Sequence, residues 1–431
     1  MNKNMIKPSI GILLCINTMI GAGLFINPGP LTKLAGPLGF LGYALGALLF
    51  LPLILCIAEL ARLHPVSGGL YVYSKIYVGN WAGFLSGWAY FLGKTTSVAV
   101  LTHKVVGFLQ TKSVFLNQYP ILLIDYLFIA FLIALNIMGT RIGGRIQYLF
   151  TSMKAIPLIM AFVTGCYFFM PDFFVFGPAD VYGVLLTLPI AVFPLMGFEV
   201  ICSVGHLIEG SSNNIKRVIL TAFCIVASID ILFQAVVYGV LGNSVQTIDY
   251  PMIAMINKLL PSIPMAAQLI NAFVFVAILG ACFSILTSNC WNLYTLAKHN
   301  HLPFASLLTK VTKSDVPWVS ISIQGALACL ILFITSEQTS LQAMSVFSQV
   351  IAFSLSALAA FFALQVAHDV RLNRIIPVLG MGASSYIMYL SFQKIVASGI
   401  SFSFLAIFVA GTIAALYQRV SEKKALKQNN I

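Results

Sequence analysis

The first long apolar stretch of the chain contains Ile20-Gly21-Ala22-Gly23-Leu24-Phe25 and, directly after it, Asn27-Pro28-Gly29-Pro30. A second stretch, near the middle of the chain, is broken in a similar way by Pro189 and by Phe193-Pro194-Leu195-Met196-Gly197-Phe198-Glu199. Glycine allows a helix to unwind and a neighbour to approach closely, and proline removes a backbone hydrogen-bond donor. Both stretches are therefore predicted to be interrupted helices.

The composition around these breaks is that of a membrane protein. Of the 431 residues, 59% are hydrophobic and 8% are charged, whereas soluble proteins carry about 25% charged residues. The mean hydropathy of +0.96 is spread along the chain, so the predicted fold is all-α and polytopic. If the chain forms about twelve membrane helices of about 20 residues each, the remaining residues are divided among loops and termini. They leave no room for a soluble domain of the usual size, about 100 to 150 residues.

The apolar stretches predict about twelve transmembrane helices with short polar loops. Their approximate ranges are 9–31, 37–61, 81–109, 120–138, 148–169, 182–207, 216–241, 266–297, 317–335, 342–367, 375–392 and 400–418, followed by a loose tail over 419–431. Freed backbone groups are tolerated in a bilayer only where they line a cavity. Breaks in the first and sixth helices therefore favour an inverted-repeat transporter with its site at the membrane midplane, and two simply kinked helices are the alternative.

The basic residues are distributed unevenly between the two sides of this topology. With the N-terminus inside, seventeen Lys and Arg residues lie on the cytoplasmic side, and the five on the other side are Lys33, Lys104, Lys112, Lys258 and Lys394. This positive-inside bias predicts a multi-pass protein of the cytoplasmic (inner) membrane with both termini in the cytoplasm. It accounts for the net charge of +12 without nucleic acid as a partner.

The sequence lacks the motifs of several other function classes. Its eight cysteines show no metal-ligand spacing, so neither a metal nor another cofactor is predicted. A phosphate-binding loop of the Walker type is absent, which argues against ATP-driven transport by this chain alone. The six histidines are scattered, whereas an intramembrane enzyme needs a paired nucleophile and base or a metal cluster.

An ordered set of motifs resembles the amino acid, polyamine and organocation (APC) superfamily of transporters. The matching segments run over most of the chain: Gly21-Ala22-Gly23-Leu24-Phe25, Ala58-Glu59-Leu60-Ala61, Pro65 to Tyr73, Gly83 with Gly87-Trp88, Gly197-Phe198-Glu199, Ala297-Lys298 to Leu302-Pro303, and Val316-Pro317. The resemblance implies alternating access by two inverted five-helix repeats, residues 1–170 and 171–370. It also implies two peripheral helices over 371–418 and a cytoplasmic tail over 419–431.

An amino acid brings a carboxylate and an ammonium group, and both must exchange water for fixed partners. Unpaired N–H groups at the N-terminal end of a half-helix suit the carboxylate, and free carbonyls at a C-terminal end suit the ammonium. We expect the first set near Gly21 and the second near Phe193. The resemblance implies that the Phe193 ring is a gate over the substrate, and simple packing is the alternative. The predicted substrate-binding residues are Met19, Ile20, Gly21, Ala22, Gly23, Gly93, Lys94, Phe193, Met196, Gly197, Ala281 and Ser284.

Ionisable residues within membrane helices are costly and are functional candidates by default. Lys154 could replace a sodium ion between the first and eighth helices, near the hydroxyls of Ser284, Thr287 and Ser288, and exchange a proton, or it could extend to the membrane surface. The resemblance implies that Glu199 couples proton movement to conformational change. The alternative for Glu199 is a carboxyl bonded to unwound backbone.

Two further acidic residues have less specific predictions. Glu59, close to Arg62, is expected to form a structural or gating ion pair. Asp230 lies near the middle of the seventh helix, where it could serve a proton pathway or form a buried polar link.

Lys94 is the residue that bears most on substrate choice. Aligned on the family motif, Gly93 and Lys94 face the side-chain end of the substrate. A cation there should repel arginine, lysine or a polyamine and favour a neutral or acidic amino acid, unless Glu199 neutralises it. The alternative is an internal ion pair with Asp230 or Glu199.

The prediction is a secondary active amino acid transporter that works by alternating access, with proton coupling favoured. An amino acid/amine exchanger without ion coupling is one alternative, and a non-transporting amino acid sensor is another. The expected partners are the amino acid, protons and the lipid bilayer. The oligomeric state is left open.

Overall fold

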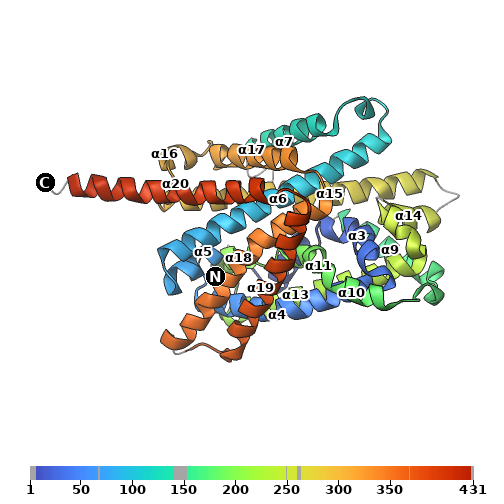
Figure 1. The fold of residues 1–431 in the computed structure, drawn as a ribbon, viewed down its shortest axis with the longest axis horizontal. Helices are drawn as coiled ribbons and strands as arrows, with labels where there is room; N and C mark the ends of the chain where they lie inside the picture. Colours follow the sequence, from blue (N-terminus) through green and yellow to red (C-terminus); the bar gives the residue numbers. More distant parts are fainter. Residues whose placement is uncertain are drawn as a thin grey trace.

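The computed structural model describes residues 6–66, 68–138, 153–248, 250–259, 264–367 and 369–428, and over these ranges the fold is all-helical (Figure 1). Extended pairing within them is confined to one isolated bridge, Ile6 to Ile208. The start of the predicted fifth helix, residues 148–152, lies outside the described residues.

The helices of the first part of the chain are α1 (Pro8–Met19), α2 (Ala22–Ile26), α3 (Pro28–Ala35), η1 (Gly36–Leu38), α4 (Gly39–Leu63), α5 (Gly69–Tyr77), α6 (Asn80–Lys112), η2 (Leu116–Gln118), α7 (Ile121–Ile137) and α9 (Ala155–Phe168). The next are η3 (Pro171–Phe173), α10 (Pro178–Leu186), α11 (Leu188–Leu195), α12 (Val200–Val204), η4 (Gly205–Leu207), α13 (Asn213–Leu241), η5 (Gly242–Thr247) and α14 (Pro251–Leu259). The last are α15 (Pro264–Lys298), α16 (Ala305–Leu308), α17 (Trp318–Ile334), α18 (Gln338–Val366), α19 (Ile375–Ala397) and α20 (Ser401–Gln428).

Eight helical segments of the described chain are long and apolar enough to cross a membrane. Three shorter apolar helices, α7, α9 and α17, accompany them. The 33-residue α6 is also long enough to cross a membrane, but it contains charged residues, among them Lys94. The predicted all-α, polytopic membrane protein is confirmed at this level.

Both predicted helix breaks are present. The first separates α1 from α2 at Ile20 and Gly21, and the second separates α11 from α12 over residues 196–199. Gly197 has φ +129°, a conformation that favours glycine, and a Cβ there would lie 2.9 Å from the carbonyl oxygen of Thr18. The two breaks therefore lie against each other, and the hydroxyl of Thr18 donates to the Gly197 carbonyl at 3.1 Å.

The long helix α6 runs beside α5, α15 and α18, with which it makes extensive contacts, while α4 packs on α13 and α19. In Figure 1, α5, α16 and the C-terminal part of α20 lie toward one end of the molecule, and α3 and α14 lie toward the other. The two broken helices therefore lie within a bundle whose other helices extend toward both ends of the molecule.

The C-terminal segment differs from its prediction. Instead of a loose tail from residue 419, α20 continues to Gln428 and extends beyond the neighbouring helices (Figure 1). The polar segment is rich in Lys, Glu, Ala and Gln, which are good helix formers, so the apolar helix before it is prolonged.

Candidate functional site

A cavity of about 750 Å³ lies at the two helix breaks and is lined by residues of α1, α2, α5, α6, α11, α12, α15 and α18. It brings together most of the predicted site residues. On its lining are Met19, Gly21, Gly23, Lys94, Lys154, Phe193, Met196, Gly197, Glu199, Ala281 and Ser284. These residues come from both halves of the chain, as expected for a site between two broken helices.

The other predicted residues lie away from the cavity lining. Ile20 is buried in the first break. Gly93 faces α18, because a Cβ there would lie 2.5 Å from Cγ of Gln349, and its carbonyl accepts from Ser345 at 2.9 Å. Glu59 and Asp230 are buried elsewhere. Ala22 begins α2, but its side chain lies outside the described part of the structure.

The first break leaves backbone groups near the cavity. The N–H of Gly21 donates to the Met19 carbonyl at 2.7 Å, so part of the Met19 acceptor capacity is used. The N–H groups of Ala22 and Gly23 open the short helix α2, where a helix has no internal acceptors for them. A Cβ at Gly23 would lie 2.9 Å from Cβ of Pro194, so this glycine also permits the close approach of α11.

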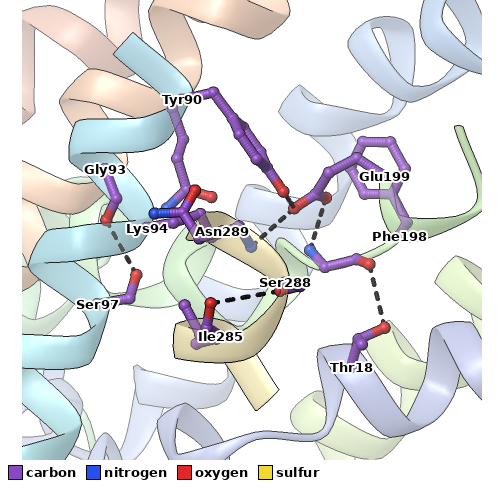
Figure 2. Close-up of polar contacts among 12 residues, drawn as sticks. Thr18, Tyr90, Gly93, Lys94, Ser97, Phe198, Glu199, Ile285, Ser288 and Asn289 are labelled. Atoms are coloured by element: carbon purple, nitrogen blue, oxygen red, sulfur yellow. Dashed lines mark hydrogen bonds and ion pairs between the residues drawn. The ribbon is translucent and has the colours of Figure 1, made fainter. Parts of the chain in front are cut away.

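An ion pair formed at the second break lies on the cavity lining. Nζ of Lys94 lies 2.7 Å from Oε1 of Glu199, and the side chains are 12% and 3% exposed. The hydroxyl of Tyr90 donates to the same oxygen at 2.8 Å, and the N–H of Gly197 donates to Oε2 at 2.7 Å (Figure 2). Of the alternatives left open by the sequence, Lys94 pairs with Glu199, and Glu199 is also bonded to unwound backbone.

Lys154 precedes α9 and is buried beside α1. Its ammonium donates to the backbone carbonyl and to Oδ1 of Asn17, both at 3.2 Å. Of the hydroxyls that were predicted near it, those of Ser284 and Ser288 line the same cavity. Thr287 donates to Asn136, and Ser288 donates to the Ile285 carbonyl at 3.4 Å. Lys154 therefore links α9 to α1, and its described hydrogen-bond acceptors are neutral oxygens.

Glu59 forms the predicted ion pair with Arg62, at 2.8 Å, within a larger cluster. Its carboxylate also accepts from Lys216 of α13 at 2.7 Å and from the N–H of Arg371 at 2.7 Å. Arg62 in turn pairs with Asp369 at 2.8 Å. The cluster joins α4, α13 and the segment between α18 and α19, away from the cavity.

Asp230 is fully buried on α13, and neither carboxylate oxygen has a hydrogen-bond partner among the described residues. The predicted polar link is therefore not formed by a described side chain. Elsewhere in the first half of the chain, Nδ1 of His103 on α6 lies 2.8 Å from the buried carboxylate of Asp125 on α7.

Sequence reasoning missed several polar residues of the cavity: Asn17, Tyr90, Ser97, Asn289 and Gln349. One signal could have found part of this set. The lining residues of α6 are Gly87, Tyr90, Lys94, Ser97 and Leu101, and their spacing of three and four residues marks one helix face. Polar side chains at that spacing in an otherwise apolar helix indicate a face that meets water or substrate.

Comparison with known proteins agrees with this architecture. A family model described as amino acid permease matches residues 12–424. The chain is 27% identical to the gamma-aminobutyric acid permease of Bacillus subtilis (strain 168) over 334 residues, 73% of this chain and 69% of that protein. It is also 27% identical to the serine/threonine exchanger SteT of the same organism over 410 residues, 89% of this chain and 91% of the exchanger.

A third relative, the amino-acid permease RocC of Bacillus subtilis (strain 168), is 26% identical over 345 residues, 74% of this chain and 71% of that protein. The match of the family model covers nearly the whole chain and includes both broken helices and the cavity. The chain therefore belongs to the amino acid permease family of the APC superfamily, and it is a multi-pass membrane transporter of amino acids and not an enzyme.

Proposed function

We propose that this permease accumulates a neutral amino acid by proton symport and alternating access in the cell membrane, with both termini in the cytoplasm. In this proposal twelve helices cross the membrane. Residues 1–170 and 171–370 form the two inverted repeats, and the two peripheral helices follow. The breaks at Gly21 and Gly197, one in each half, support the repeat assignment.

The substrate backbone is proposed to bind at the two breaks. Its carboxylate accepts from the N–H groups of Ala22 and Gly23, which lack acceptors within α2. Its ammonium donates to the remaining lone pair of the Met19 carbonyl and to the carbonyls at the C-terminal end of α11, near Phe193. Gly197 shapes the break without taking substrate, because its N–H and carbonyl are already bonded to Glu199 and Thr18.

The observation that carries the substrate class is the ion pair between Lys94 and Glu199. Two opposite charges 2.7 Å apart leave the proposed side-chain end of the site without net charge. An acidic substrate side chain would have to compete with Glu199 for Lys94, and a basic one would have to compete with Lys94 for Glu199. A neutral side chain does not disturb the pair, so neutral substrates are favoured over the acidic ones that Lys94 alone would attract.

Lys154 is the proposed coupling residue. Its ammonium binds the Asn17 carbonyl and side chain and so holds α1 against α9. Loss of a proton would turn the ammonium into an amine, remove the charge and weaken both bonds to α1. We propose that this release lets the half-helix α1 move, and that Glu199 transmits substrate binding to α12 through the same cavity.

The shape of the cavity supports an inward-open state. Its lining extends from Gly21 at the break to Lys298 and His299, which are exposed at the C-terminal end of α15. In the proposed topology this end faces the cytoplasm, so the substrate would leave along α15.

Exchange is the second candidate function. The relative that matches 89% of this chain and 91% of its own length is a serine/threonine exchanger, whose named substrates are neutral. An exchanger would use the same neutral site but would return to the outward state only with a substrate bound. The coupling residue Lys154 would then fix α1 without cycling its proton.

One reconstitution experiment separates these mechanisms. Labelled acidic, neutral and basic amino acids are offered to proteoliposomes that are empty or preloaded with unlabelled amino acid, with and without an inward proton gradient. Gradient-driven accumulation of a neutral amino acid in empty vesicles supports symport. Uptake only into preloaded vesicles, independent of pH, identifies an exchanger, and saturable binding without uptake identifies a sensor.

A further inference from the structure

A second cavity of about 230 Å³ lies between the start of α6, the C-terminal ends of α5 and α15, and the Ala415 to Arg419 turn within α20. It is separate from the proposed substrate path except at His299, which lines both cavities. The lining residues that define its chemistry are Lys75, Asn80, Trp81, His299, His301 and Arg419. Amide, aromatic and basic groups thus converge on one small space.

The cavity is cationic, and its lining contains no carboxylate among the residues whose side chains the structure describes. Lys75 and Arg419 are its basic side chains, and neither has a carboxylate partner among the described residues. Each instead lies over an aromatic ring: Nζ of Lys75 is 5.6 Å from the Tyr71 ring centre, and Cζ of Arg419 is 5.5 Å from that of Trp81. Rings hold the cations in place but do not neutralise them.

The positive potential affects a neighbouring group. Burial lowers the pKa of His301 to about 4, and electrostatic interactions with Lys75 and His299 act in the same direction. His301 is therefore a neutral imidazole at physiological pH, with Nε2 2.9 Å from the hydroxyl of Tyr71. It lines the cavity as a hydrogen-bonding group, while Lys75 and Arg419 supply the charge.

The start of α6 adds further donors. This 33-residue helix begins at Asn80 after Gly79, and no side chain caps its N-terminus. Both Asn80 and Trp81, in its first turn, line the cavity. The first backbone N–H groups of a long helix, with the positive end of its dipole, suit a bound anion, and here two fixed cations reinforce them.

The cavity lies at the level of a membrane surface. Arg419 is next to the last residue of the apolar segment Ser401–Val420 of α20. On the turns of α20 that precede Arg419, Ile413 is 59% exposed and Leu416 is 47% exposed, so exposed apolar side chains lie between the cavity and the membrane interior. A ligand with an anionic head and acyl chains would match both parts.

We propose that this cavity binds the phosphate group of an anionic phospholipid, with Lys75, Arg419 and the first turn of α6 as the phosphate ligands. Basic pockets between membrane helices on the cytoplasmic side are suited to such head groups. The bound lipid would tie α20 to α5 and α6. The proposal depends on the chain being a membrane protein and not on the substrate or the coupling mechanism.

The test uses thermal unfolding of the full-length, detergent-purified protein, titrated separately with dioleoyl phosphatidylglycerol, dioleoyl phosphatidylcholine and inorganic phosphate. Phosphatidylglycerol is expected to raise the unfolding midpoint saturably, and phosphatidylcholine is expected to have little effect. The double variant Lys75→Gln/Arg419→Gln should weaken the apparent affinity for phosphatidylglycerol by about tenfold or more. Lipid retained through purification, measured by mass spectrometry, should fall in the same variant.

The matched control is Lys310→Gln/Lys313→Gln, which removes two exposed cations from the loop after α16 and leaves the cavity intact. It should keep the wild-type response. An equal loss in both double variants, or an unchanged response in the cavity variant, would overturn the proposal. Saturable stabilisation by inorganic phosphate, with no further shift from lipid, would assign the cavity to a soluble phosphate and overturn the lipid assignment. If the double variant does not fold, the single variants Lys75→Gln and Arg419→Gln replace it in the same titration.

Discussion

The ammonium of Lys94 and the carboxylate of Glu199 depend on each other because both are nearly excluded from solvent. Removal of one partner leaves a buried charge without a counter-ion, at a cost of about 3–5 kcal/mol for a dry pair. Cavity water reduces this cost, but the remaining charge would still face the substrate. The pair therefore makes a sharper prediction about selectivity than either residue alone.

We expect Lys94→Gln to lower uptake of neutral amino acids by about tenfold or more and to raise the relative uptake of basic ones, because Glu199 is left unpaired. Glu199→Gln should shift preference toward acidic substrates. Tyr90→Phe, which removes one hydrogen bond to Glu199 and no charge, should cost a few-fold, from about 0.5–1.5 kcal/mol. Competition assays in proteoliposomes measure all three. An unchanged substrate profile in both charge variants would contradict the neutral-site proposal.

The proposed role of Lys154 in proton coupling leads to a separate prediction. Lys154→Gln keeps a polar side chain beside Asn17 but cannot bind or release a proton, so substrate binding should persist while accumulation driven by a proton gradient is lost. Lys112→Gln, at the exposed end of α6, is the matched control and should keep wild-type coupling. Full gradient-driven accumulation by Lys154→Gln would eliminate this residue as the coupling site.

At the scale of elements, the second break depends on the backbone of Gly197. Its φ of +129° is unfavourable for any other residue, and an added Cβ would meet the Thr18 carbonyl at 2.9 Å. Gly197→Ala should therefore destabilise the fold by about 1–3 kcal/mol or more. Gly382→Ala, in α19 where a Cβ would meet no atom within 4 Å, should be neutral or stabilising by up to about 1 kcal/mol. Thermal unfolding in detergent compares the two, and equal midpoints would show that the break tolerates a side chain.

The ion pair between Glu337, which precedes α18, and Lys394 of α19 should make stability depend on pH. Burial alone would raise the pKa of Glu337, but hydrogen bonds from Lys394, Ser340 and Thr339 outweigh it and lower the pKa to about 2. In the unfolded chain the pKa of a glutamate carboxyl is about 4.3, so the stabilisation by this ion pair is fully present above that pH and is lost as the pH falls toward 2. Because Glu337 is half exposed, the effect should stay below about 1 kcal/mol. Glu337→Gln should remove this part of the acid sensitivity of the unfolding midpoint, and an identical pH profile in the variant would refute the assignment.

At the scale of the whole molecule, the sequence predicts local features better than long-range contacts. The breaks at Gly21 and Gly197 follow from residue chemistry at the break itself, and the structure contains both. The partner of Lys94 could not be chosen, because Glu199 and Asp230 lie on different distant helices and only packing decides between them.

Orientation around a helix was also difficult to predict. Gly93 and Lys94 are neighbours in sequence, yet Gly93 faces α18 and Lys94 faces the cavity. Adjacent residues point about 100° apart on a helix, so a motif alignment identifies the right turn more easily than the right face. The helical continuation of α20 was missed for a different reason, because polarity was taken as a sign of a loose tail although the residues favour a helix.

The proposed inward-open state predicts which side of the membrane reaches the cavity. Thr295 lines the cavity on α15, between the helix breaks and the exposed Lys298. In a background without reactive native thiols, Thr295→Cys should react with a membrane-impermeant maleimide added from the cytoplasmic side, and transported substrate should slow the reaction. Val114→Cys, 84% exposed after the other end of α6, should react from the opposite side and be insensitive to substrate. Labelling of both cysteines from the same side would overturn the proposed topology, because α6 would then not cross the membrane between the cavity mouth and residue 114.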